Sequence, residues 1–154
     1  MKPRRIYIDT SVVGGCLDAE FREASLQLFE LFQTGDLIAV VSRLVRSEVR
    51  RAPPAVRAML AQIPSAHRED VRVTREAVGL AKRYIAAGVL GRAMQADAHH
   101  IAAATVHRVD VLASWNFKHI VNVRRIHGYN AVNLREGRSP VEIQTPAEVV
   151  RYGR

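Results

Sequence analysis

The sequence predicts an α/β fold, in which a parallel sheet carries helices on both faces. Apolar runs of strand length alternate along the chain with longer segments that have apolar residues at helical spacing. Such an alternation indicates parallel strands joined by helical crossovers. No repeat, low-complexity tract or linker interrupts the 154 residues, so we expect a single domain over residues 1–154.

In the first half of the chain, apolar spacing and turn residues predict the elements. Phe21, Leu28 and Leu31 recur at helical spacing, and Gly35 then turns the chain. Ser42 suits the N-cap of a helix that ends before two prolines. The expected strands are 5–9 and 37–41, and the expected helices are 21–33, 43–51 and 54–62.

In the second half, Thr74 is expected to cap a helix that ends near Gly88. Residues 122–139 have the least regular pattern, so no element is assigned there. The expected strands are 71–73, 109–113 and 141–144, and the expected helices are 75–87 and 95–107.

Composition narrows the classes of function. The net charge of +8 favours polyanionic partners, such as nucleic acid. The single cysteine, Cys16, excludes an intrachain disulfide and a zinc site built from several cysteines. No apolar run approaches the length of a membrane span, and the opening MKPRR leads directly into a strand without a cleavage site. We therefore expect no membrane association and a cytoplasmic location.

Polar side chains follow two of the expected strands. Asp9 comes directly after the apolar run Ile6-Tyr7-Ile8, and Ser114 and Asn116 follow strand 109–113. Ligand sites of open parallel sheets form beyond the carboxyl ends of the strands, where the strand order reverses. Asp9 alone could be a helix cap or a turn former. Its role depends on whether other carboxylates meet it.

Two further carboxylates lie on helices that are largely apolar. Glu48 falls inside the apolar arc of helix 43–51, where an unpaired charge is costly and needs a partner. A rim position or a salt bridge with Arg51 would also explain it. Asp97 lies in the first turn of helix 95–107, where a favourable interaction with the helix dipole is the simpler explanation. The apolar arc of helix 43–51 consists of Leu44, Val45, Val49 and Ala52. The opposite side of this helix carries Arg43, Arg46 and Arg50.

Taken together, Asp9, Glu48 and Asp97 predict a metal site. Three carboxylates in one pocket would repel each other strongly unless a cation lay among them. Carboxylate oxygens suit Mg²⁺ or Mn²⁺, and such ions activate water and offset the charge of a scissile phosphate. An acidic pocket in a basic protein suits the cleavage of a polyanion.

Four short motifs in this order resemble those of the PIN-domain ribonuclease family. They are IDTSVV with Asp9, SRLVRSEV with Glu48, DAHHIAAA with Asp97 and VDVLASWNFKHI with Asn116. The resemblance covers nearly the whole chain and is closest to the VapC-type toxins of type II toxin–antitoxin systems. It implies a Rossmann-like sheet of about five parallel strands and a Mg²⁺- or Mn²⁺-dependent endoribonuclease. It also implies an RNA substrate, a homodimer and a cognate antitoxin.

The resemblance also assigns roles to single residues. Asp9, Glu48 and Asp97 would hold the metal. Ser114, together with Thr10 or Ser11, would position water, backbone or substrate. The family usually has an acid at the position of Asn116. This asparagine can offer its carbonyl oxygen to the metal or to its water and would complete the shell with Ser114, but it brings no charge, so the affinity for a second ion should fall. An alternative is therefore a catalytically weakened or inactive PIN-like module that binds RNA or a partner protein. A plain structural α/β domain, with Glu48 paired to an arginine, is a third hypothesis.

The remaining polar residues have weaker assignments. Lys118, Arg124 and Arg125 follow the predicted site and are the predicted RNA contacts, although a solvated rim would explain them equally well. His99, His100 and His107 are interpreted as surface or packing residues rather than as a metal site. His119 could contact a phosphate or be structural, and Trp115 and Phe117 are interpreted as packing residues. The arginine side of helix 43–51 is assigned to solvent or to a protein partner.

Overall fold

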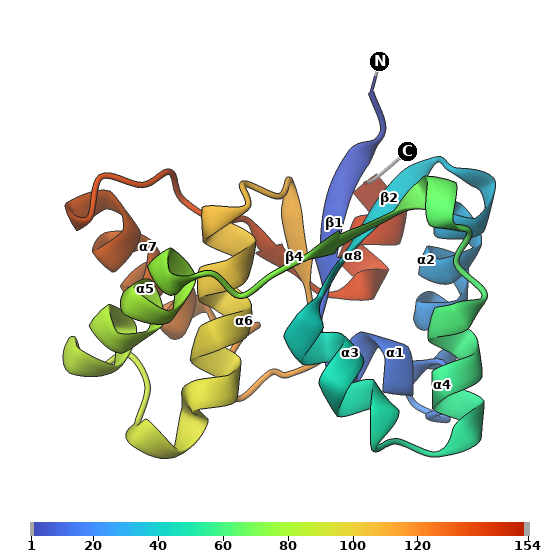
Figure 1. Cartoon of the computed structure of the whole chain (residues 1–154), viewed down its shortest axis with the longest axis horizontal. Coiled ribbons are helices and arrows are strands. Elements are labelled where there is room, and N and C mark those ends of the chain that lie inside the picture. Colours follow the sequence, from blue (N-terminus) through green and yellow to red (C-terminus); the bar gives the residue numbers. More distant parts are fainter. Residues whose placement is uncertain (1, 153–154) are drawn as a thin grey trace.

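The computed structural model describes residues 2–152. Their strands form one five-stranded sheet, all parallel, with the strand order β3-β2-β1-β4-β5 (Figure 1). The strands are β1 Arg4–Ile8, β2 Leu37–Ser42, β3 Arg68–Val71, β4 Val111–Ala113 and β5 Ile143–Gln144. This sheet confirms the predicted fold class. Residues 1, 153 and 154 of the expected domain lie outside the described range.

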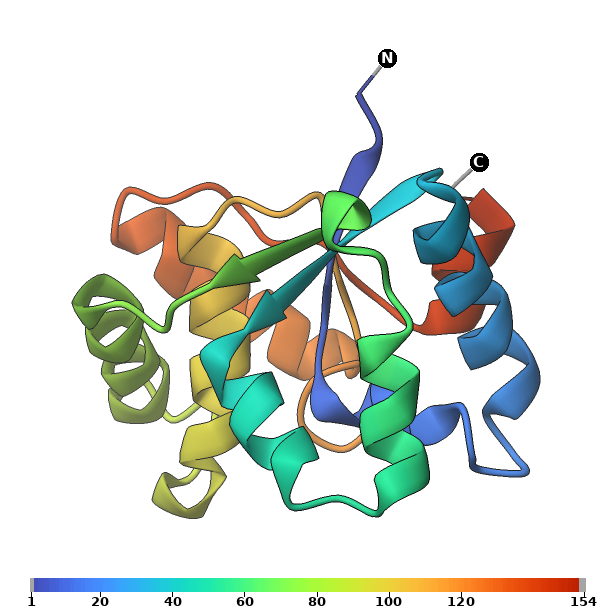
Figure 2. The same ribbon diagram turned by 45° about the vertical axis from the view of Figure 1, so that its right-hand side comes forward.

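Helices cover both faces of the sheet (Figures 1 and 2). The packed group α5, α6 and α7 lies on one face, and α2 packs against α8 on the other, together with α1 and α4. The helices are α1 Thr10–Gly15, α2 Arg22–Thr34, α3 Arg43–Arg50, α4 Pro54–Ala61, α5 Arg75–Ala86, α6 Gln95–Val106, α7 Val123–Arg135 and α8 Pro146–Tyr152, with short 3₁₀ turns η1 Ser65–His67 and η2 Arg92–Met94. Within residues 2–152, no helix combines the length and the apolar character that crossing a bilayer requires.

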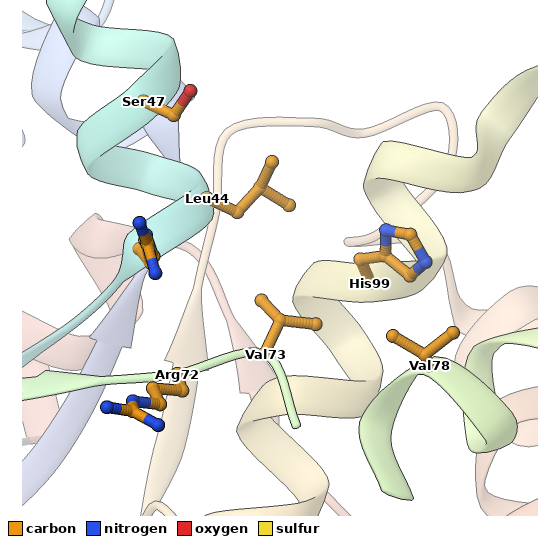
Figure 3. Close-up of a pocket in the computed structure, with 7 residues that line it drawn as sticks. Leu44, Ser47, Arg72, Val73, Val78 and His99 are labelled. Atoms are coloured by element: carbon orange, nitrogen blue, oxygen red, sulfur yellow. The ribbon is translucent and has the colours of Figure 1, made fainter. Parts of the chain in front are cut away.

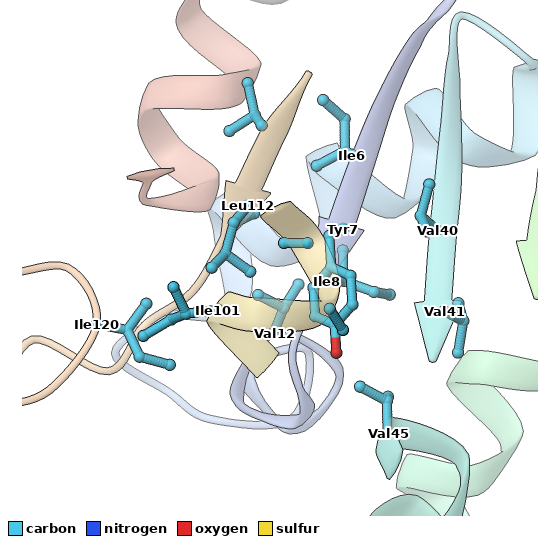
Figure 4. Close-up of a cluster of buried hydrophobic side chains, with 14 of the residues drawn as sticks. Ile6, Tyr7, Ile8, Val12, Val40, Val41, Val45, Ile101, Leu112 and Ile120 are labelled. Atoms are coloured by element: carbon cyan, nitrogen blue, oxygen red, sulfur yellow. The ribbon is translucent and has the colours of Figure 1, made fainter. Parts of the chain in front are cut away.

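The core centres on β1, which lies between β2 and β4. Ile6, Tyr7 and Ile8 are all 0% exposed because helices cover both faces of the strand. Figure 4 shows these side chains between those of β2 and β4, with Ile101 of α6 and Ile120 packed against them. Burial on both faces explains why β1 is a continuous apolar run rather than an alternating one. It also delivers Asp9 to a buried position directly after the strand.

Three expectations about the elements are wrong. The edge strand β3 spans Arg68–Val71 instead of 71–73, because Glu69 and Asp70 give it a charged pattern that edge strands tolerate. The stretch 122–139 contains the helix α7. The helices α1 and α8 were not expected either, and both are short.

The helix α7 is hard to recognise because few of its residues are buried. Tyr129 and Val132 face the core, whereas most of the helix is polar. Gly128 interrupts the sequence pattern for a steric reason. A Cβ at this position would come within 2.8 Å of Val89 Cγ1, so glycine allows α7 to approach the segment between α5 and α6.

Candidate active site

The order of the strands places a switch point at the carboxyl ends of β1 and β4, the position at which open parallel sheets form their crevice, and we use the word crevice for this position. The chain runs from β1 to β2 on one side of β1 and returns to β4 on the other, which is a topological switch point. Ile8 pairs with Ala113, so the residues that follow these two strands lie side by side. Ser114 Oγ donates to Asp9 Oδ2 at 2.6 Å. The structure therefore brings together the two polar positions expected at this edge.

Asp9 is a buried carboxylate whose hydrogen-bond donors are uncharged. Its side chain accepts from Ser11 Oγ at 2.6 Å and from Val12 N at 3.3 Å, so it also caps α1. The residue is only 4% exposed. Burial raises the pKa of Asp9, although the nearby His100 and the hydroxyl donors oppose the shift. The structure thus combines the helix cap considered from the sequence with a desolvated negative charge.

Glu48 lies at the margin of the crevice, on α3. Its Oε1 accepts from Thr10 Oγ1 at 2.7 Å and contacts His100 Nε2 at 2.9 Å. The hydrogen bond with His100 is the main reason that the pKa of Glu48 is lowered. The side chain is 34% exposed, so Glu48 is less buried than its place in the apolar arc predicts. Its partner is a histidine, not Arg51.

A buried network fixes His100. Its Nδ1 lies 2.7 Å from the hydroxyl of Tyr7, which donates to Ser42 Oγ at 2.8 Å. Ser42 Oγ also accepts from Val45 N and thereby caps α3. The network ties β1, α3 and α6 to the position of one carboxylate.

Asp97 occupies the other side of the crevice. Its Oδ1 accepts from Asn116 Nδ2 at 3.3 Å, and its Oδ2 lies 3.1 Å from His119 Nδ1. Asn116 also donates its backbone N–H to Ser114 Oγ at 2.9 Å, which links Asp97 to the Asp9 side of the crevice. The amide at position 116 is therefore a donor to Asp97, a role that a carboxylate could not fill.

The crevice suits a hard divalent cation in the kind of donor that it offers, since its carboxylate, hydroxyl and amide oxygens are the ligands that Mg²⁺ and Mn²⁺ prefer. The detailed arrangement is looser than a cage. Within residues 2–152, no three His, Cys, Asp or Glu side chains form a group that could hold one metal ion. Instead, Asp9, Glu48 and Asp97 are each held by their own donors. The metal role of these residues stays a prediction.

The three predicted RNA contacts line one pocket on the surface, which we call the lysine pocket. Lys118, Arg124 and Arg125 line a pocket of about 480 Å³ beside Gly88 and Val89. Arg125 Nη1 donates to the backbone oxygen of Val89 at 2.6 Å, so it is held in place, whereas Lys118 and Arg124 are exposed. The loop that carries Asn116 and His119 leads directly to this pocket.

The aromatic residues of that loop differ from each other. Trp115 stacks on Phe21 with ring centroids 4.4 Å apart, and its Nε1 donates to Ser25 Oγ, which confirms the expected packing role. Phe117 is 50% exposed, and its ring centroid lies 6.2 Å from those of Phe21 and Trp115, so it packs on these two rings with only part of its surface.

Sequence reasoning missed the polar partners of the carboxylates. His100, His119, Tyr7 and Ser42 are not among the predicted site residues. His100 was interpreted as a surface or packing residue, and His119 as a phosphate contact or a structural residue. One signal was available for His100. Because α6 is buried around most of its circumference, a histidine in its middle must find a partner inside the protein.

Comparisons with known proteins support the fold. Neither a sequence-family model nor a curated protein sequence matches the chain. Among solved structures, one match is VapBC2 from Rickettsia felis bound to a DNA fragment from its promoter. The TM-score is 0.57 and the identity 10%, over 92% of this chain and 98% of that chain. FitAB bound to the IR36 DNA fragment matches with a TM-score of 0.59 and 13% identity, over 92% and 95%.

A third neighbour is VapC20 from Mycobacterium tuberculosis, a toxin that cleaves the sarcin–ricin loop. It matches with a TM-score of 0.51 and 16% identity, over 73% of this chain and 91% of that chain. At such low identity, the likeness establishes the fold alone. The chain therefore has a VapC-like PIN-domain fold, as the resemblance of its motifs predicts.

Proposed function

We propose that the protein is an endoribonuclease that hydrolyses RNA phosphodiester bonds with Mg²⁺ or Mn²⁺. The observation that carries the proposal is the buried carboxylate of Asp9 at the switch point, with Glu48 and Asp97 on either side of it. A desolvated carboxylate with uncharged hydrogen-bond donors is a strong attractor for a cation. The net charge of +8 supports a polyanionic substrate.

In this proposal, Asp9, Glu48 and Asp97 would hold the ion, which would stabilise charge on the phosphate and activate a water molecule. The other side chains orient these carboxylates. Ser114 donates to Asp9, and Thr10 donates to Glu48. Asn116 donates to Asp97 Oδ1 and His119 contacts Asp97 Oδ2. His100 contacts the same Glu48 Oε1 that accepts from Thr10.

The lysine pocket would hold phosphates of the RNA on the Asp97 side of the crevice. Guanidinium and ammonium groups bind phosphate oxygens through charge-assisted hydrogen bonds. Lys118 and Arg124 are exposed and available for such contacts, and the bond to Val89 holds Arg125 at the pocket.

We further propose that the protein is the toxin of a toxin–antitoxin pair, with a cognate antitoxin, a homodimeric assembly and a cytoplasmic location. The likeness of the fold to VapBC2, FitAB and VapC20 supports the antitoxin partner in this proposal. Copurification of the chain with the product of a small neighbouring reading frame would test the antitoxin partner.

Cleavage of a panel of structured RNAs tests the proposed activity. The panel includes a sarcin–ricin loop hairpin and is incubated with Mg²⁺, Mn²⁺ or a chelator. We expect cleavage with either ion and none with the chelator, and we expect Asp9→Asn and Glu48→Gln to lose cleavage while they keep the fold. An Asp9→Asn protein that cuts at the wild-type rate would contradict the assignment.

One observation favours the second candidate, an RNA- or protein-binding module with little or no catalysis. Asn116 replaces an acid, and its amide already donates to Asp97. Calorimetric titration of Mn²⁺ separates the two candidates. Absent ion binding with retained RNA affinity would favour the module, whereas a gain of cleavage in Asn116→Asp would identify a weakened nuclease.

A further inference from the structure

We propose that the protein holds a second segment of the RNA strand on the outer side of α3, in a pocket formed by Arg43, Arg46, Arg50 and Arg72. We call this site the arginine pocket. The proposal rests on the nuclease function, because it describes how the same substrate continues beyond the crevice. It assigns a role to the arginine side of α3 that the carboxylate chemistry leaves unexplained.

The arginine pocket is a built feature of the surface. Three arginines of α3, together with Arg72 beyond β3 and the hydroxyl-bearing Ser47, line a cavity of about 490 Å³. No acidic side chain lines it. Arg43 and Arg50 are separated along the helix by about 10 Å at a rise of ~1.5 Å per residue, so the row extends beyond the reach of a single phosphate.

The charges of this pocket are almost uncompensated. Within residues 2–152, the side chains of Arg43, Arg50 and Arg72 form no ion pair or hydrogen bond. Arg46 reaches Asp70 only at 3.8 Å, and that carboxylate also contacts another arginine. Clustered guanidinium groups repel one another, and their planar forks match phosphate oxygens in a bidentate geometry. The cluster is therefore suited to an external polyanion.

An apolar pocket adjoins the arginine pocket and favours a nucleotide strand over an acidic peptide. The two pockets share Arg43, Ser47 and Arg72. In Figure 3, Leu44 and Val73 face the imidazole ring of His99 across this apolar pocket, which has a volume of about 440 Å³. A nucleic-acid strand places a flat base beside each phosphate, and bases stack on rings and apolar side chains. Carboxylates of a peptide would use only the charged half.

The position of the pockets fits a continuous path for the RNA. Ser47 and His99 directly precede Glu48 and His100, and the latter two are in contact at 2.9 Å. The arginine pocket thus lies beyond the Glu48 side of the crevice, on the other side of the contact between α3 and α6. The lysine pocket lies beyond the Asp97 side, after the loop that contacts Asp97. A strand that crosses the crevice would reach positive charge at both ends.

Binding of a labelled single-stranded RNA tests the proposal in the full-length Asp9→Asn background, where cleavage cannot consume the probe. The variant Arg43→Gln/Arg72→Gln removes two exposed guanidinium groups that have no partner among residues 2–152. We expect about tenfold weaker binding at low salt, and a slope of log K against log salt that is smaller by about 1.4, since each lost phosphate contact on a single strand contributes ~0.7. The matched control is Arg22→Gln/Lys82→Gln, which lowers the charge equally at exposed helix positions outside the pocket.

Each outcome has a definite meaning. A loss in the arginine variant no larger than in the control would overturn the site. If the arginine variant lost binding to a polyglutamate peptide but kept its RNA binding, the proposed RNA site would also be overturned, because the pocket would then serve an acidic protein. Cleavage by the wild-type chain is measured separately. Absent cleavage with the expected binding loss would remove the proposed function and leave the strand site in place.

Discussion

Tyr7→Phe is the sharpest test of the buried network behind the crevice. Tyr7 is 0% exposed, and its hydroxyl lies 2.8 Å from Ser42 Oγ and 2.7 Å from His100 Nδ1. Phenylalanine keeps the ring, which packs edge-on against the imidazole of His100 with centroids 5.9 Å apart. The substitution therefore removes two hydrogen bonds and leaves the packing of the core in place.

The size of the effect follows from the groups that lose a partner. Ser42 Oγ keeps its bond from Val45 N, whereas His100 Nδ1 is left buried without a partner. One buried unsatisfied polar group costs about 1–3 kcal/mol, so we expect the free energy of unfolding to fall by about 2 kcal/mol. For a chain of this size, that loss corresponds to a decrease in Tm of about 4–8 °C.

Urea denaturation followed by Trp115 fluorescence measures the stability, and cleavage of a structured RNA measures the function. We expect an unchanged m-value and slower cleavage, because His100 no longer holds Glu48 in a fixed position. Tyr84→Phe is the matched control, since this tyrosine is also 0% exposed and donates to Asn133, away from the crevice. It should lose similar stability and keep its cleavage rate. Wild-type stability of Tyr7→Phe, or equal loss of cleavage in both variants, would refute the reasoning.

Three other substitutions have defined outcomes. Burial raises the pKa of Asp9, so its ionisation destabilises the native state as the pH rises above about 4. In urea titrations, the stability of Asp9→Asn relative to the wild type should therefore increase from acidic to alkaline pH, and a constant difference would contradict this. The pKa of Glu48 is lowered, so its contribution is present above about pH 4.3 and is lost on acidification; Glu48→Gln should flatten the acid limb of the same profile. Arg5 forms two 2.7 Å contacts with Glu69, and both side chains are about a third exposed; Arg5→Gln should cost about 1 kcal/mol, less at high salt, and an effect that does not change with salt would show that packing rather than charge is responsible.

Much of the fold could be predicted from local signals. Ser42 and Thr74 were expected as N-caps, and both side chains accept from the backbone N–H three residues later. The parallel-strand rule predicted that Asp9 and Ser114 would lie at one edge, because it depends only on strand direction. The edge strand at Arg68–Val71 and the helix α7 were missed, since both expose much of their surface and therefore lack a strong apolar pattern.

The detailed site could be predicted only in part. The sequence identified the acidic side chains, but the partner of His100 is Tyr7, which lies 93 positions away. Which face of α6 meets β1 depends on how the helix packs on the sheet, and no local pattern encodes that angle. The same limit applies to Asn116, whose amide could be interpreted as a weakened ligand but not as the donor that holds Asp97.

The rate of RNA cleavage as a function of Mn²⁺ concentration, measured for the wild type and for Asp97→Asn, tests the central claim most directly. If the carboxylates of the crevice hold the ion, the wild-type rate rises with Mn²⁺ and saturates. The variant is then slower by about a hundredfold or more, because it has lost a ligand of the cation that stabilises the transition state. Equal rates for the two proteins, or a wild-type rate that is unaffected by a chelator, would contradict the account.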